Sequence, residues 1–165
     1  MCTYPEKVTL EEGLQLLLPH VDRVSEEIIP IEESNGRMLA ANIISGENIP
    51  PFNRSPYDGY ALRAADTAGA SKEAPVQLSV IQEVPAGSTA SREIREGEAV
   101  KILTGAPVPE GATAIVKFED TLFTEDTVTI SAPSKEGCNI VLVGEDVKEG
   151  ELVIEKGRLL HLFLQ

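Results

Sequence analysis

The chain has 165 residues, of which 42% are hydrophobic and 4% aromatic with no tryptophan, and its formal net charge is −13. That charge argues against nucleic acid, whose phosphates need a basic protein face, and against anionic membrane surfaces. The sequence shows neither the pattern of a signal peptide nor an apolar run near the roughly 20 residues of a membrane span. We therefore expect a soluble cytoplasmic protein of one or two small domains.

The first third of the chain predicts one helix and then short elements. Thr9 and Glu12 match a capping box, in which each side chain bonds the other residue's backbone N–H. Apolar residues follow at helical spacing, at Leu10, Leu14, Leu17, Leu18 and Val21. This pattern predicts a helix over 9–18, ended by the next proline. Segment 26–34 predicts a short strand entering a turn, and 35–45 is compatible with a short helix followed by a strand, although its residues do not settle which.

From residue 76 the pattern changes to β. Short runs rich in Val, Ile and Thr predict strands at 76–84, 98–104, 113–120, 126–131 and 139–143, with a strand pair around 148–150. Turn residues separate these runs every 8 to 12 or so positions, which indicates an antiparallel β domain. With the first helix, the predicted fold class is α+β, mainly β.

A stiff loop presents one carboxylate. Three prolines restrict the backbone ahead of Asp58, and Gly59 after it accepts a positive φ. Arg54 and two tyrosines lie in the same segment. Binding groups concentrate in loops held by rigid scaffolds, so Asp58 is a candidate site residue. The plainer interpretation is that Asp58 only hydrogen-bonds its own turn.

Other residues offer weaker signals. Thr104 and Gly105 follow a predicted strand, where the hydroxyl and neighbouring N–H groups would hold an oxyanion, although an ordinary strand exit has the same sequence. The acidic pairs Glu145–Asp146 and Glu119–Asp120 would suit Mg²⁺ or a solvated turn. No catalytic motif surrounds either histidine. Cys2 and Cys138 form no CxxC and are expected to be free thiols in a reducing cytosol.

Three segments in this order carry a specific resemblance: PFNRSPYDGYA (51–61), KILTGAPVPEGA (101–112) and GCNIVLVGED (137–146). They resemble the N-terminal half of the molybdopterin molybdenumtransferase family, which includes bacterial MoeA and the gephyrin E domain. The resemblance implies an enzyme that inserts molybdenum from molybdate into adenylylated molybdopterin, with Mg²⁺ assisting. It also implies a helix-containing domain I (1–48 plus 145–165), used for dimerisation, interrupted by an inserted antiparallel β-rich domain II (49–144).

The resemblance also implies site residues. In the family, the cleft forms between domain III of one subunit and domain II of the other. Matched by motif, the catalytic residues would be Asp58 and Thr104, the substrate-binding residues Arg54, Ser55 and Gly105, and the metal ligand Asp146. The implied partners are a second copy of the chain, a molybdopterin adenylyltransferase and molybdoenzyme-maturation proteins.

The sequence departs from the family at one segment and at its end. Residues 141–143 read Val-Leu-Val where the family often has arginines, which removes positive charge from the path of an anionic substrate. The chain stops where domain III would begin, in an apolar run at 159–164. The resemblance implies that domain III supplies most of the pterin and nucleotide site, so we expect an N-terminal part that lacks the main pterin-binding domain and is inactive alone. Two alternatives stay open: a non-catalytic module that docks cofactor-assembly proteins, and a hydrolase with Asp58 as general acid or base.

Overall fold

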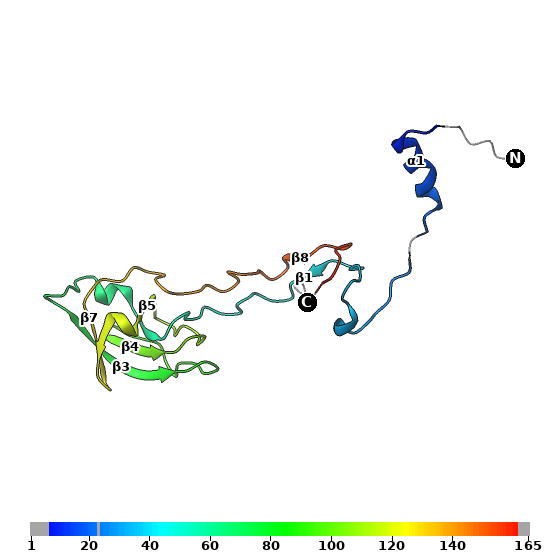
Figure 1. Cartoon of the computed structure of the whole chain (residues 1–165). Coiled ribbons are helices and arrows are strands. Elements are labelled where there is room, and N and C mark those ends of the chain that lie inside the picture. The colour runs from blue at the N-terminus through cyan, green and yellow to red at the C-terminus, as the bar shows by residue number, and fades with distance from the viewer. Residues whose placement is uncertain (1–6, 23, 162–165) are drawn as a thin grey trace. The chain divides into compact units, whose positions relative to one another are not determined.

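The computed structural model describes residues 7–22 and 24–161, and the chain divides into two compact units (Figure 1). One unit combines residues 1–41 with 155–165, and the other comprises 42–154. Cys2 and the apolar residues at 162–164 lie outside the described residues. The domains inferred from the resemblance, 1–48 with 145–165 and 49–144, stay a prediction.

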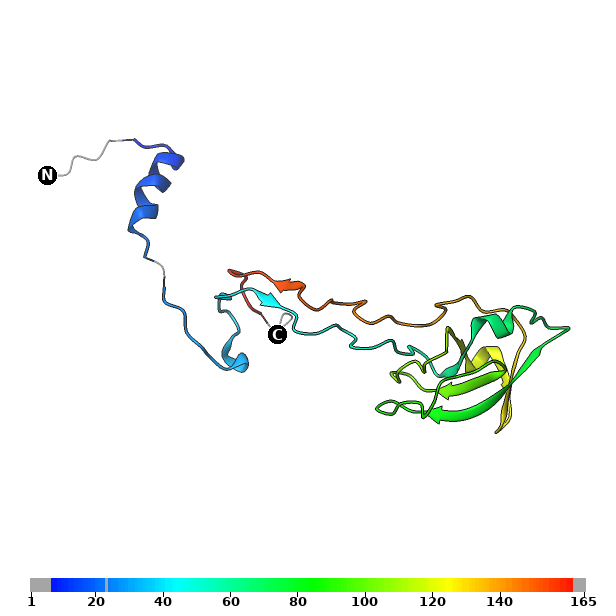
Figure 2. The same cartoon turned by 180° about the vertical axis from the view of Figure 1, so that it is seen from behind.

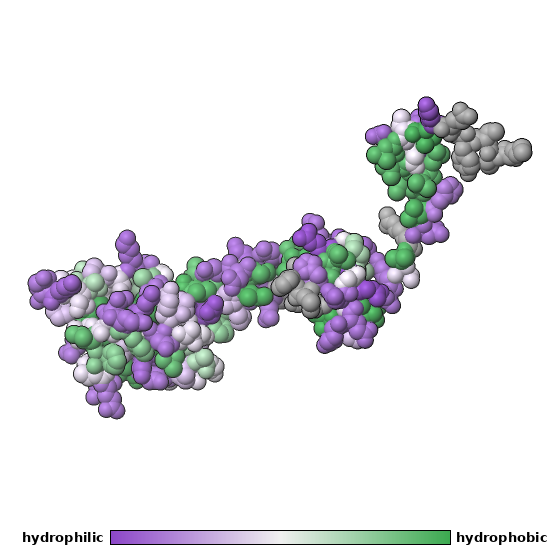
Figure 3. All heavy atoms as spheres, in the orientation of Figure 1, coloured by the Kyte–Doolittle hydropathy of each residue, from purple (hydrophilic) through white to green (hydrophobic). Residues whose placement is uncertain are grey.

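The first unit contains the single α-helix of the described residues, α1 (Leu10–Leu17), followed by a 3-10 turn at Leu18–His20. The predicted capping box is confirmed. The Thr9 N–H donates to the Glu12 carboxylate over 2.8 Å, and the Glu12 N–H donates to Thr9 Oγ1 over 3.2 Å. No side chain of α1 is buried, and the space-filling view shows its apolar side chains at the surface (Figure 3).

The strand predicted at 26–34 and the helix predicted within 35–45 are wrong. A 3-10 turn, Ile31–Glu33, follows Pro30. Beyond it the backbone pairs with the end of the chain: the Gly36 N–H donates to the Leu160 carbonyl over 2.8 Å, and Met38 lies opposite Leu159. Partners distant in sequence thus replace the local hydrogen bonds that a helix would have made.

The second unit begins and ends with two extended segments that run side by side (Figure 1). β1 (Ile43–Ile44) pairs antiparallel with β8 (Leu152–Ile154). The pairing continues where the Ile49 N–H donates to the Val147 carbonyl over 2.8 Å and the Arg54 N–H to the Val141 carbonyl over 3.0 Å. The strand predicted at 139–143 is therefore reduced to one bridge, and the predicted pair around 148–150 is replaced by pairing with β1.

A curled six-stranded sheet forms the body of the second unit, seen from behind in Figure 2. In spatial order its strands are β5 (Ala114–Lys117), β2 (Gly59–Leu62), β4 (Glu98–Ile102), β3 (Val76–Val84), β7 (Thr127–Ile130) and β6 (Thr121–Phe123). Neighbours are antiparallel except β3 and β4, which are parallel. The purely antiparallel domain was thus a wrong prediction, because the long connection 85–97 lets β4 return in the direction of β3.

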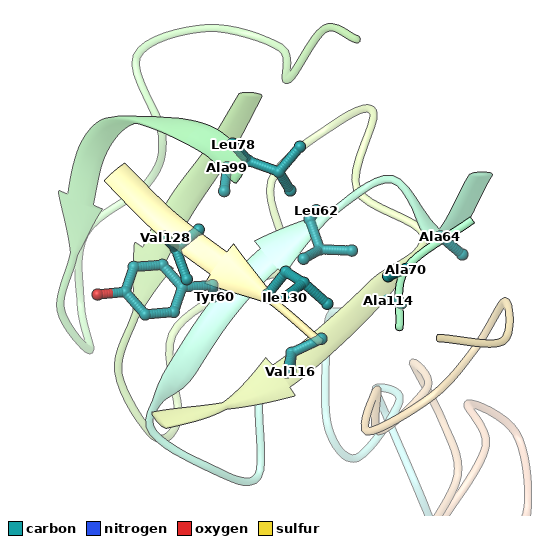
Figure 4. Packing of buried hydrophobic residues seen from close by; sticks show 10 residues of the cluster. All are labelled: Tyr60, Leu62, Ala64, Ala70, Leu78, Ala99, Ala114, Val116, Val128 and Ile130. Carbon is teal, nitrogen blue, oxygen red and sulfur yellow. The ribbon is translucent and has the colours of Figure 1, made fainter. Parts of the chain in front are cut away.

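Buried apolar side chains of this sheet form two clusters. One gathers around Tyr60, Leu62 and Ile130 (Figure 4), and the other around Val84, Val100 and Ile115. β2 is buried along its whole length. A Cβ at Gly59 would lie 2.2 Å from the Val116 carbonyl oxygen, so only glycine fits where β2 begins. The start of β2 is therefore a rigid base for the residue before it.

Candidate functional site

The sheet brings Asp58 and Thr104 together at one of its ends. Asp58 directly precedes β2 and Thr104 follows the end of β4, and these strands pair antiparallel with Gly59 opposite Ile102. Asp58 Oδ1 accepts two hydrogen bonds from Thr104, one from the N–H over 2.7 Å and one from the hydroxyl over 2.8 Å. The two residues that the resemblance marked as catalytic are therefore one hydrogen-bonded pair.

The pair keeps Asp58 ionised. The Thr104 N–H, then the Thr104 hydroxyl, and more weakly the charge of Lys101, hold the pKa of the Asp58 carboxyl below its ordinary value of 3.8. Hydrogen bonds donated to a carboxylate favour its charged form. Asp58 is exposed, so its second oxygen faces solvent. At neutral pH the site presents an oriented carboxylate that accepts hydrogen bonds or protons.

Two loops are joined behind this pair. The Ser55 N–H donates to the Ala106 carbonyl over 3.0 Å, and the Gly105 N–H donates to the Ser55 carbonyl over 2.8 Å. The Ser55 side chain is wholly buried, and its hydroxyl donates to the Tyr57 carbonyl and accepts from the Tyr57 N–H. Gly105 adopts a φ of 85°, which favours glycine. Ser55 and Gly105 thus hold the two loops in register, while their predicted contact with substrate stays a prediction.

The donors that the oxyanion hypothesis assigned to Thr104 and its neighbours are engaged within the protein. Both donors of Thr104 go to Asp58, and the Gly105 N–H goes to Ser55. The next N–H, of Ala106, donates to the Leu103 carbonyl over 3.0 Å. Because each of these donors already has a protein acceptor, Thr104 acts here by orienting a carboxylate.

Arg54 and Asp146 belong to the paired extended segments. The backbone of Arg54 bonds that of Val141 in both directions, and its side chain is half-buried. The Asp146 N–H donates to the Ile49 carbonyl over 2.9 Å, and its side chain is exposed. The neighbouring Glu145 carboxylate accepts from the Leu142 N–H over 2.8 Å. This local contact agrees with the interpretation of the Glu145–Asp146 pair as part of a turn.

These residues do not assemble a magnesium site by themselves. Within 7–22 and 24–161, no three His, Cys, Asp or Glu side chains gather closely enough to hold a metal ion. Magnesium is normally held by one or two carboxylates together with water and substrate phosphates. The described residues therefore do not complete a Mg²⁺ centre by themselves, and the assignment of Asp146 as one of its ligands stays a prediction.

A groove of about 550 Å³ opens between strand β3 and the β6–β7 hairpin. Tyr60, Lys101 and Glu83 lie in register across β2, β4 and β3, and Lys101 Nζ is 2.7 Å from a Glu83 carboxylate oxygen. No short stretch of the sequence reveals this group, because its members come from three strands. The only sequence signal for the group was the charged residue Lys101 inside an apolar strand. That Glu83 lies beside it depends on the parallel register of β3 and β4.

A sequence model described as the MoeA N-terminal region, domains I and II, matches residues 8–163. The chain belongs to this family. The crystal structure of a molybdopterin biosynthesis MoeA protein from Pyrococcus horikoshii OT3 superimposes on it with a TM-score of 0.87 at 42% identity, over 93% of this chain and 41% of that one. The family resemblance is confirmed, together with a mostly β fold that carries one helix and a curled sheet.

Curated relatives agree with this membership. A molybdopterin molybdenumtransferase of Staphylococcus aureus is 37% identical over 93% of this chain and 37% of its own length. One of Staphylococcus epidermidis is 39% identical over 91% of this chain and 36% of its own length. This MoeA N-terminal region thus spans little more than a third of these relatives. Across the residues that the structure describes, no helix is long and apolar enough to cross a membrane.

Proposed function

We propose that this MoeA N-terminal region forms one wall of the active site of a molybdopterin molybdenumtransferase, which inserts molybdenum from molybdate into adenylylated molybdopterin. The observation that carries the proposal is the Asp58–Thr104 pair, built from two motifs of the family and placed on a rigid strand end. Relatives that match nearly the whole chain are molybdopterin molybdenumtransferases, which supports the reaction class.

The charge of Asp58 defines what it does in this proposal. An ionised carboxylate repels the molybdate oxyanion, so it acts on groups of the substrate that donate hydrogen bonds or protons. Thr104 orients Asp58 and lowers its pKa, which keeps Asp58 a charged hydrogen-bond acceptor and makes it a poor general acid and a weak base at neutral pH. A hydrolase mechanism in which Asp58 acts as the general acid is therefore disfavoured.

The remaining parts of the proposed site come from outside this chain. We propose that the active assembly is a homodimer and that the other wall, including the groups that complete a Mg²⁺ site with Asp146, lies in the part of the relatives that this chain does not span. A molybdopterin adenylyltransferase would supply the adenylylated substrate, and maturation proteins would take the product, all in the cytoplasm. This chain alone is then expected to be inactive.

The proposal is tested by Asp58→Asn in a complete molybdenumtransferase polypeptide that carries this region. Formation of molybdenum cofactor from molybdate and adenylylated molybdopterin should fall at least about tenfold, because an amide neither accepts a proton nor carries the charge. Light scattering should show an unchanged dimer. Asp22→Asn, which removes an exposed carboxylate from the other compact unit, is the matched control. Normal cofactor formation in Asp58→Asn would remove Asp58 from the reaction and leave the non-catalytic docking module as the better interpretation.

A further inference from the structure

The residue before Asp58 is held both by its backbone and by its ring. The Ser55 hydroxyl, which is wholly buried, donates to the Tyr57 carbonyl and accepts from the Tyr57 N–H over 3.2 Å. In addition, the Lys117 ammonium lies over the Tyr57 ring, with Nζ 3.9 Å from the ring centroid. A cation within about 6 Å of a ring centroid is attracted by the negative face of the ring. Tyr57 is thus held from its own loop and from strand β5.

Strand pairing brings Lys117 to this place. Lys117 is the last residue of β5 and lies opposite Gly59, the first residue of β2. A Cβ at Gly59 would lie 3.0 Å from Lys117 Cα, so the two backbones approach as closely as only a glycine allows. The N–H of the following residue, Phe118, donates to the Asp58 carbonyl over 3.2 Å. The end of β5 therefore contacts both Tyr57 and Asp58.

Lys117 differs from Lys101, the other lysine near Asp58, in its partner. Lys101 pairs with the Glu83 carboxylate at 2.7 Å. Within 7–22 and 24–161, no carboxylate forms an ion pair with Lys117. The chain nevertheless has 27 Asp and Glu residues against 14 Lys and Arg. The Tyr57 ring is therefore the contact that defines the position of the Lys117 ammonium.

The direction of the Asp58 side chain depends on the backbone of Tyr57. Tyr57 lies in a bend outside β2, and its side chain is 42% exposed, so neither strand pairing nor burial fixes it. The carboxylate that follows it must meet both donors of Thr104, at 2.7 and 2.8 Å. A displacement of about 1 Å at a reacting group can lower a rate about a hundredfold. Contacts that fix Tyr57 therefore matter to the pair.

We propose that Tyr57 and Lys117 are positioning residues for Asp58. The ammonium holds the ring of Tyr57, and the ring fixes the loop from which the Asp58 carboxylate reaches Thr104. Neither Tyr57 nor Lys117 touches the reacting groups. The consequence for catalysis rests on the proposed function, whereas the consequence for the Asp58–Thr104 hydrogen bonds does not.

The first test measures the Asp58–Thr104 pair in the 165-residue chain by NMR. Tyr57→Leu removes the ring and leaves every charge in place. We expect amide exchange at Thr104 to become at least about threefold faster, because its hydrogen bond to Asp58 opens more often. The pKa of the Asp58 carboxyl should rise toward 3.8 as its donors are lost. Tyr57→Phe keeps the ring and should show neither change.

Variants of Lys117 test the other half of the contact. Lys117→Met should accelerate Thr104 exchange by about the same factor as Tyr57→Leu, because both remove the cation–ring contact. Lys117→Arg keeps a cation over the ring and should leave the exchange rate unchanged. Lys72→Met is the matched control, since it removes the same charge from an exposed residue of the connection that leads into β3.

A double variant separates positioning from a direct effect of charge. If Lys117 acts through the ring, Lys117→Met combined with Tyr57→Leu should accelerate exchange no more than Tyr57→Leu alone. Effects that multiply would show that the ammonium acts on Asp58 by its charge, and they would overturn the inference. Unchanged exchange at Thr104 in both single variants would also overturn it.

The second test uses a complete molybdenumtransferase polypeptide that carries this region. Tyr57→Leu and Lys117→Met should each lower kcat about threefold to tenfold with KM unchanged, and Tyr57→Phe and Lys117→Arg should restore it. A raised KM with unchanged kcat would indicate a substrate contact and overturn the positioning role. Faster Thr104 exchange without any effect of Asp58→Asn on cofactor formation would uphold the contact and reject the proposed function. The reverse result would reject the contact alone.

Discussion

The curled sheet and the helix-bearing unit of this chain are stabilised in different ways. All of the buried Ala, Val, Leu, Ile and Tyr side chains among the described residues lie between Tyr60 and Ile130, within the sheet and its connections. Helix α1 buries none, and Leu10 on it is 75% exposed. What holds α1, besides its own backbone hydrogen bonds, is its capping box, a pair of local side-chain-to-backbone hydrogen bonds. An eight-residue helix is shorter than an isolated helix needs to be stable in water, so the sheet is the part that folds on its own contacts.

The largest expected effect is that of Gly59→Ala in the sheet. A Cβ at this position would lie 2.2 Å from the Val116 carbonyl oxygen, on a strand buried on both faces, and backbone atoms cannot move aside cheaply. We expect a loss of more than about 5 kcal/mol of unfolding free energy, measured by urea denaturation. Gly69→Ala is the control, since nothing lies within 4 Å of its added Cβ. A well-folded Gly59→Ala protein would show that β2 is not the rigid base of the site.

The next effect compares one leucine from each region. Leu62→Ala empties a fully buried position in the sheet and should cost about 2 to 5 kcal/mol in the same urea measurement. Leu10→Ala removes an exposed side chain of α1 and should change the unfolding free energy by less than about 0.5 kcal/mol. Equal losses in the two variants would mean that α1 packs against something, and the contrast between the regions would fail.

A smaller effect is expected at the cap of α1. Thr9→Ala removes the oxygen that accepts from the Glu12 N–H and should destabilise the helix by about 1 kcal/mol. The amide exchange rates of α1 should rise while those of β2 and β4 stay unchanged. Thr9→Ser keeps the acceptor and serves as the control. If the exchange rates of the sheet also rose, the two units would be coupled in stability.

The smallest effect concerns charge in the sheet. The Arg92 guanidinium, and then the Arg95 N–H, lower the pKa of the Glu98 carboxyl to about 2. Because this pKa lies below the ordinary value of 4.5, the pair stabilises the folded chain above that value and loses its effect as the pH falls toward 2. Arg92→Met should return the pKa of Glu98 toward 4.5 in an NMR titration and flatten the acid dependence of stability. An unchanged pKa in that variant would assign the shift to the backbone donor alone.

Structural features could be predicted from the sequence where the residues that form them are close together in the chain. The Thr9–Glu12 cap was predicted from two residues three positions apart. The strand at 76–84 was predicted from the pattern of its own side chains. The motif around Asp58 marked a site residue, but its partner Thr104 is joined to it only through the β2–β4 register. The strand predicted at 26–34 failed because Pro30 and the pairing of 36–39 with 157–160 outweigh local propensity.

The sequence by itself indicated the family through the resemblance of three segments. It also determined the helix cap, most of the strands, and the stiff loop that carries Asp58, because each of these follows from backbone chemistry over a few residues. The tertiary structure alone decided three things: that β3 and β4 run parallel, that Thr104 uses its donors on Asp58, and that Tyr60, Lys101 and Glu83 share one groove. These depend on strand register, which is selected by side-chain burial across the whole sheet and which no short stretch of sequence specifies.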